Sequence, residues 1–176
     1  MAFERVDSED IWQGKIATVR VDTFRYEDGK EAEREIVTHP GAVTMLPWDG
    51  EHLWLVRQPR EPVDEPALLE LPAGKLDVDG EEPLDSAKRE LAEEIGKGAR
   101  EWRHLVDFFT SPGLLTEKHH LYLATDLYDE HADSGEDERI EIVTLTADEV
   151  DGTIPKVRDA KTLIGLLWFK AYLQDR

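Results

Sequence analysis

The sequence has no cysteine, no long apolar run, and few basic residues for its number of acidic ones. Without cysteine, disulfides, thiolate metal ligands and a cysteine nucleophile are excluded. No apolar run approaches the roughly 20 residues that span a bilayer. The N-terminus is acidic where a signal peptide would be basic. We therefore expect a cytoplasmic protein with no membrane partner.

Acidic residues dominate the charge of the chain: 40 Asp and Glu stand against 21 Lys and Arg, a formal net charge of −19. Such a surface repels the phosphates of nucleic acids, so we expect no nucleic-acid partner. A small phosphate substrate would be repelled as well, unless divalent cations and a few placed arginines overcome the field. The alternative is that the charge serves only solubility.

The hydrophobic pattern predicts an α/β layered domain. With 176 residues, 40% of them apolar, the chain is long enough to bury a core. Helical spacing predicts one helix over 83–95, stopped by Gly96, and another over 157–173. Alternation and turn signals predict strands at 16–25, 35–38, 42–48, 52–58, 68–71, 102–110, 119–127 and 139–145.

The first predicted helix carries a cluster of carboxylates. Glu90, Glu93 and Glu94 stand at i, i+3 and i+4, so they project from one face within a narrow arc. Like charges at this spacing destabilise a helix by a few tenths of a kcal/mol per pair. A hard divalent cation with oxygen ligands would compensate, and Arg89 can pair with Glu93 one turn on. The alternative is a solvated acidic helix face.

The sequence from Gly74 to Lys97 resembles the Nudix box. That motif runs Gly, five residues, Glu, seven residues, then Arg-Glu-aliphatic-x-Glu-Glu-x-Gly-aliphatic, and every fixed polar position is filled here. The chain departs from it in a first spacer of six residues and in Lys97 at the last aliphatic position. The resemblance implies an α/β/α sandwich with a mixed sheet over residues 41–176. A region over 1–40 with an antiparallel β hairpin would precede it.

The same resemblance implies hydrolysis of a pyrophosphate with the help of Mg²⁺ or Mn²⁺. Bound metals screen phosphate charge, acidify a water and stabilise the leaving oxygen. The implied metal ligands are Glu90, Glu93, Glu94 and the carbonyl oxygen of Ala73. Glu81 is implied either as an outer ligand or as a group that orients Arg89.

Features outside the box resemble the ADP-ribose pyrophosphatase branch of the family. Among them are the Ser111-Pro112-Gly113 turn, in which Pro112 lies sixteen residues after Gly96, and the run Asp159-Ala-Lys-Thr162. The branch would convert ADP-ribose to AMP and ribose 5-phosphate. The implied substrate contacts are Arg34, Arg60, Pro112, Gly113 and Glu117. For each arginine the alternative is a surface ion pair.

A catalytic base is implied in the acidic loop that follows. Glu136 is the first choice, and Glu138 is the second choice or an extra metal contact. The alternative is an ordinary solvated loop, because a base must come within hydrogen-bonding reach of the water.

Two other functions stay open at this point. The enzyme could act on another nucleoside diphosphate sugar such as GDP-mannose, since some relatives stack adenine on an aromatic residue after an N-terminal glycine. Here Lys15 follows Gly14, and Trp12 or Phe24 would have to substitute. A non-catalytic ligand sensor is the other alternative, although the box keeps all its glutamates.

Two further expectations concern assembly and metal ligation. The N-terminal region resembles that of relatives that form intertwined homodimers, so we expect a homodimer. His119 and His120 are adjacent in a predicted strand and should point to opposite faces, so they cannot both ligate one metal.

Overall fold

The computed structural model describes residues 2–130, 132 and 139–174. By its internal contacts the chain forms two compact units. The first unit comprises Met1–Gly41 and Phe108–Lys118, and the second comprises Ala42–Asp107 and His119–Arg176.

The first unit contains a three-stranded antiparallel sheet of β1 (Phe3–Gln13), β2 (Thr18–Tyr26) and β3 (Glu31–Thr38), in that order. The hairpin predicted around Asp28 and Gly29 is formed by β2 and β3, and Gly29 takes a positive φ of 79° in the turn. Asp28 supports the turn by accepting a hydrogen bond from the backbone N–H of Lys30 at 3.1 Å. Strand β1 was not predicted and extends the hairpin to a sheet.

The second unit is built on a seven-stranded mixed sheet with the path β10-β5-β4-β9-β8, to which β6 and β7 add by pairing with β5 and β4. Its strands are β4 (Ala42–Trp48), β5 (His52–Arg60), β6 (Glu65–Glu70), β7 (Ala73–Lys75), β8 (Lys97–Phe109), β9 (Lys118–Asp129) and β10 (Glu141–Thr146). The helices are α1 (Pro83–Ile95), α2 (Val150–Thr153) and α3 (Ala160–Gln174), with short 3₁₀ turns at Glu61–Val63, Ala147–Glu149 and Ile154–Lys156.

Strands β4 and β5 separate after a single paired position, Trp48 with Leu53. The backbone from β6 to β7 fills the opening, because β6 pairs with the far half of β5 and β7 pairs with the start of β4. Between them, the carbonyl of Pro72 accepts a hydrogen bond from Met45 N–H at 2.9 Å. This insertion brings Ala73 and Gly74 into the sheet beside α1.

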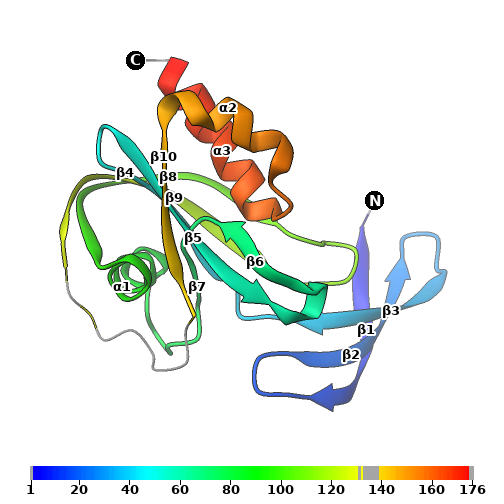
Figure 1. The fold of residues 1–176 in the computed structure, drawn as a ribbon. Coiled ribbons are helices and arrows are strands. Elements are labelled where there is room, and N and C mark those ends of the chain that lie inside the picture. Colours follow the sequence, from blue (N-terminus) through cyan, green and yellow to red (C-terminus); the bar gives the residue numbers. More distant parts are fainter. Residues whose placement is uncertain (1, 131, 133–138, 175–176) are drawn as a thin grey trace. The chain divides into compact units, whose positions relative to one another are not determined.

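Helices cover both faces of this sheet, as Figure 1 shows with α1 on one side and α3 on the other. Strand β4 is buried along its whole length, as expected for a strand packed on both faces. Its side chains Val43 and Met45 join the α1 core with Leu91. On the other face the ring of Trp48 lies 4.9 Å from that of Phe169 in α3. The α/β/α sandwich predicted from the family resemblance is confirmed.

Helix α3 starts three residues later than predicted because Asp159 caps it. The Asp159 carboxylate accepts hydrogen bonds from the backbone N–H and the hydroxyl of Thr162 at 2.9 and 2.6 Å. The same Thr162 Oγ1 accepts a hydrogen bond from the backbone N–H of Leu71 at 2.7 Å, which ties the helix to the sheet. Among the described residues, no helix is both long and apolar enough to cross a membrane.

Candidate active site

Helix α1 begins and ends as its sequence predicts. Pro83 occupies the first turn, where its missing N–H costs nothing, and Gly96 ends the helix in the left-handed conformation with φ 66°. Ala87, Leu91 and Ile95 are buried against the sheet. Glu90, Glu93 and Glu94 lie beside this buried stripe and are partly buried, and the helix itself fixes their relative positions.

Two of these glutamates lie against the β7 backbone. The Oε2 of Glu94 accepts a hydrogen bond from the N–H of Ala73 at 3.1 Å. A methyl group at Gly74 would lie only 1.9 Å from Cδ of Glu90 and 2.3 Å from its Oε1. The glycine of the motif therefore provides the space that the Glu90 carboxylate occupies.

Arg89 connects the carboxylates of the motif. Its Nη1 donates to Glu90 at 2.8 Å and to Glu93 at 3.0 Å, while Nε and Nη2 bind Glu81 in a fork at 3.1 and 3.0 Å. The hydrogen bond from Arg89 holds the pKa of Glu81 below its usual value of 4.5. The predicted pairing of Arg89 with Glu93 is confirmed, and Glu81 binds the same arginine.

The structure accommodates both departures from the motif. The extra residue of the first spacer lies in a turn closed by the hydrogen bond from Glu81 N–H to the carbonyl of Val78 at 3.1 Å, with Gly80 at a positive φ of 78°. Lys97 places its ammonium group 4.5 Å from the centre of the Trp54 ring and 2.5 Å from Asp129. A cation over an indole replaces an aliphatic contact there.

The donor set around α1 fits a hard divalent cation, because it consists of carboxylate and carbonyl oxygens. Glu90 and Glu93 are turned towards Arg89, and Glu94 towards the N–H of Ala73. In the described part of the chain these three glutamates do not form a group of ligand atoms within 4.8 Å of one another. Ion binding would therefore require their side chains to reorient, while the helix keeps them on one face.

Arg60 lies in a network that the sequence did not reveal. Its Nε and Nη2 bind both oxygens of the buried Glu70 at 2.6 and 2.7 Å, and Lys161 of α3 binds the same carboxylate at 2.5 Å. Burial alone would raise the pKa of Glu70, but these two cations outweigh it and lower the pKa below its usual value. Two of the three guanidinium nitrogens of Arg60 are thus engaged. Its charge also lies within range of Glu94.

Three of the predicted substrate residues line one pocket of the first unit. Its volume is about 290 Å³, and it brings together Arg34, Pro112 and Gly113. Aromatic rings form part of the wall, with the Phe3 ring 5.4 Å from that of Phe24 and edge-on to it. The complete lining is Phe3, Phe24, Tyr26, Arg34, Ile36, Pro112, Gly113, Leu114, Leu115 and Thr116.

Three further predicted site residues have different outcomes. Glu117 accepts a hydrogen bond from the hydroxyl of Thr110 at 2.5 Å and lies 3.7 Å from Nδ1 of His39. It is not among the residues that line the pocket. The candidate bases Glu136 and Glu138 lie outside the described residues.

Comparison with known proteins identifies the class of protein. The family model for the NUDIX domain matches residues 38–164. The chain therefore belongs to the Nudix hydrolase family and is a pyrophosphohydrolase, as the resemblance implied. Members of this family generally use divalent metal ions.

Individual relatives narrow the comparison. The chain is 36% identical to an ADP-ribose pyrophosphatase of Bacillus subtilis (strain 168), over 94% of this chain and 91% of that protein. It is 37% identical to the methanol dehydrogenase activator of Bacillus methanolicus, with the same coverage. An ADP-ribose pyrophosphatase of Mycobacterium tuberculosis (strain ATCC 25618 / H37Rv) is 43% identical over 71% of this chain and 60% of its own length. The crystal structure of an ADP compounds hydrolase has the same fold, with a TM-score of 0.87 at 23% identity over 99% of this chain and 96% of that one.

Proposed function

We propose that this protein hydrolyses the pyrophosphate of ADP-ribose to AMP and ribose 5-phosphate with Mg²⁺ or Mn²⁺ bound at α1. The observation that carries the proposal is the convergence of Glu90 and Glu94 on the Ala73–Gly74 backbone, with Arg89 fixing the neighbouring carboxylates. The names of relatives at 36% and 43% identity support ADP-ribose as the substrate.

The residues at α1 and β7 have different roles in the proposed reaction. Glu90, Glu93, Glu94 and the Ala73 carbonyl would hold the ions, and Glu81 would keep Arg89 in place. Bound divalent ions supply charge screening and an acidified water. Arg89 restrains the carboxylates so that they do not scatter by mutual repulsion, which matters in a chain of net charge −19.

A base is needed that the ions do not occupy. We propose Glu136 for this role, with Glu138 as the second choice, on the strength of the family pattern alone. Glu136→Gln should lower kcat far more than it raises KM, and Glu138→Gln should do so only if the roles are reversed. Equal, near-normal rates for both variants would remove the loop from the mechanism.

The pocket of the first unit is suited to a nucleoside diphosphate. Arg34 offers a planar cation for phosphate oxygens. Phe24 and its aromatic neighbours offer a surface on which a base can stack. Glu70 already engages two of the three guanidinium nitrogens of Arg60, so we expect Arg34→Ala to raise KM more than Arg60→Lys does. Another nucleoside diphosphate sugar such as GDP-mannose would use the same groups.

A substrate panel with phosphatase coupling tests the proposal. ADP-ribose should be turned over faster than GDP-mannose, ADP-glucose and NADH in Mg²⁺ and in Mn²⁺. Glu94→Gln should lower kcat/KM by about 100-fold or more. The exposed Glu101→Gln on β8 is the matched control and should leave the rate unchanged. Equal rates across the panel would refute the substrate assignment, and an active Glu94→Gln variant would refute the site.

We further propose that the first unit makes the protein a homodimer. Every residue of β1 is exposed, including the apolar Phe3, Ile11 and Trp12 at 64%, 55% and 58%. Among the described strands, β1 pairs with β2 alone and so presents an open edge. Sedimentation at micromolar concentration should give twice the chain mass, and Trp12→Glu should shift it towards the monomer. A monomeric wild-type protein would contradict this.

A further inference from the structure

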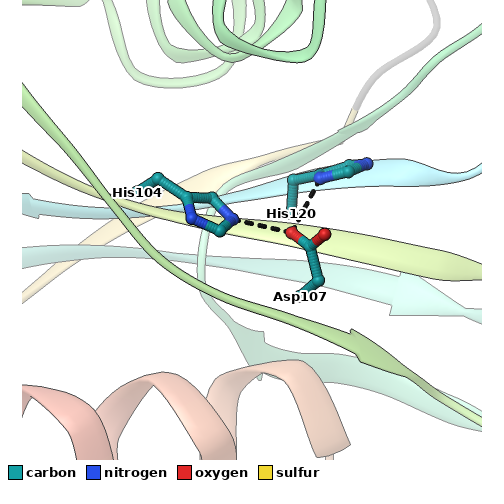
Figure 2. A group of neighbouring side chains, drawn as sticks. All are labelled: His104, Asp107 and His120. Atoms are coloured by element: carbon teal, nitrogen blue, oxygen red, sulfur yellow. Dashed lines mark hydrogen bonds and ion pairs between the residues drawn. The ribbon is translucent and has the colours of Figure 1, made fainter.

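A second group of ligand-type side chains lies on strands β8 and β9, and Figure 2 shows it. The Oδ1 of Asp107 is 2.6 Å from Nε2 of His104 and 2.8 Å from Nδ1 of His120. The three ligand atoms lie within 4.8 Å of one another. In the part of the chain that the structure describes, these residues form the one such group of three.

The backbone directs these side chains to one place. Residues three apart in a regular strand face opposite sides of the sheet, so the contact between His104 and Asp107 requires a local departure from regular alternation in β8. The His104 ring packs edge-on against Tyr122 at 5.4 Å, and Tyr122 belongs to the core between the sheet and α1. The group therefore lies on the α1 face of the sheet, with one ring held by packing.

Adjacent positions in β9 separate the two histidines of that strand, as predicted. His119 is buried and its Nδ1 lies 2.8 Å from the hydroxyl of Thr44, whereas His120 contacts Asp107. The sequence excluded a site made from His119 and His120 together, but it did not indicate that His120 would meet two residues of another strand.

We propose that His104, Asp107 and His120 form a binding site for one divalent transition-metal ion of the Zn²⁺ class, separate from the carboxylates of α1. Two imidazoles and one carboxylate are ligands that Zn²⁺, Ni²⁺ and Co²⁺ prefer, whereas Mg²⁺ prefers oxygen ligands alone. Three protein ligands leave a coordination position for water or an anion.

The spacing and the exposure of the group suit an ion. Zn²⁺ lies about 2.0–2.2 Å from nitrogen and oxygen ligands, so tetrahedral neighbours stand about 3.4 Å apart. The two nitrogen-to-oxygen distances of 2.6 and 2.8 Å would need to open by about 0.8 and 0.6 Å to reach this spacing. The side chains of His104, Asp107 and His120 are 47%, 36% and 19% exposed, which gives the ion a path of entry. The net charge of −19 raises the local concentration of cations.

The same contacts could instead be only hydrogen bonds from two imidazole N–H groups to a carboxylate. The two possibilities differ in a measurable way, because only a metal site releases protons on adding Zn²⁺ and withdraws the nitrogen lone pairs of both rings. They also predict different effects of replacing one histidine by a hydrogen-bond donor such as glutamine.

Zn²⁺ binding to untagged full-length protein, measured by competition with a chromophoric chelator in excess Mg²⁺, tests the proposal. Excess Mg²⁺ occupies oxygen sites without competing for imidazole. Wild type should bind one Zn²⁺ that His104→Gln and His120→Gln each weaken by about 100-fold or more. His52→Gln is the matched control, since His52 lies 3.9 Å from a single carboxylate, Asp49, and its loss should change nothing.

A second measurement keeps the test decisive if a variant fails to fold. In wild type, adding Zn²⁺ should shift the side-chain ¹⁵N resonances of His104 Nε2 and His120 Nδ1 and leave those of His52 in place. Failure to bind Zn²⁺ under excess Mg²⁺, unshifted resonances, or binding that survives both glutamine substitutions would each overturn the proposal. None of these outcomes depends on the hydrolase activity.

Discussion

Replacing Gly74 by alanine tests the physical reason for the first residue of the motif. The φ angle of Gly74 is not in the left-handed region, so alanine can adopt the backbone conformation without strain. Its methyl group, however, would lie 1.9 Å from Cδ and 2.1 Å from Cγ of Glu90. Contacts so short force one of the two groups to move, and the flexible Glu90 side chain moves more easily than the paired β7 backbone.

The expected losses of stability and of activity follow from the movement of the Glu90 side chain rather than the β7 backbone. Because the side chain can swing towards solvent, we expect the free energy of unfolding to fall by less than about 1 kcal/mol. The carboxylate, in contrast, leaves the place where the Ala73–Gly74 backbone and Arg89 hold it. Misplacing one such group by about 1 Å costs about 100-fold in rate, which corresponds to about 2.7 kcal/mol of transition-state stabilisation.

The assay is kcat/KM for ADP-ribose as a function of Mg²⁺ concentration, together with urea denaturation. Gly152→Ala in α2 is the matched control, since a methyl group there has nothing within 4 Å. Glu90→Gln and the double variant complete a cycle. Because Gly74→Ala is expected to act through Glu90, the double variant should be no worse than the poorer single one. Additive losses, or a folded Gly74→Ala enzyme with normal activity, would refute the reasoning.

Three further predictions concern stability. Glu70→Gln should cost about 3 kcal/mol at pH 7 because Arg60 and the buried Lys161 lose the buried carboxylate that both of them bind. Since the folded-state pKa of Glu70 is lowered, its contribution is present above its usual 4.5 and is lost as pH falls through the lower value, so urea midpoints of variant and wild type should converge in acid. Gly165→Ala should lower stability by about 1–3 kcal/mol, because its methyl group would lie 2.2 Å from Cδ1 of Leu71. A rise in melting temperature would instead show that helix propensity dominates. Lys97→Ala should cost about 0.5–1 kcal/mol in thermal unfolding through loss of the contact with Trp54, with no effect if that contact is only incidental.

The sequence was informative where the local rules and the motif agreed. Helix α1 was predicted at its observed bounds, because Pro83 and Gly96 mark its ends and the buried positions recur at helical spacing. The hairpin of β2 and β3 followed from alternation and from the Asp28–Gly29 turn. Strand β1 was missed, because all its residues are exposed and its pairing with β2 has two register shifts, so no clear alternation marks it. The start of β8 was missed because Lys97 to Glu101 has few residues that favour strands.

Local sequence patterns did not predict contacts between residues that are far apart in the chain. Arg60 and Glu70 pair through the β5–β6 hairpin, but Lys161 comes from 91 residues further along the chain. The group of His104, Asp107 and His120 depends on an irregularity within β8, and no residue type in that strand predicts such an irregularity. By contrast, the family motif implied that Glu90 and the Ala73 carbonyl serve one metal site, and the structure places Glu90 against Gly74, the neighbour of Ala73.

The short segment from Leu71 to Ala73 is hydrogen-bonded to helices on both faces of the sheet. Thr162 of α3 accepts the N–H of Leu71, and Glu94 of α1 accepts the N–H of Ala73. A shift of α3 would therefore move the peptide that carries the Ala73 carbonyl. The distance between that carbonyl and the glutamates of α1 would change with it. Substitutions in α3 can in this way change the position of a predicted metal ligand through the backbone of residues 71–73.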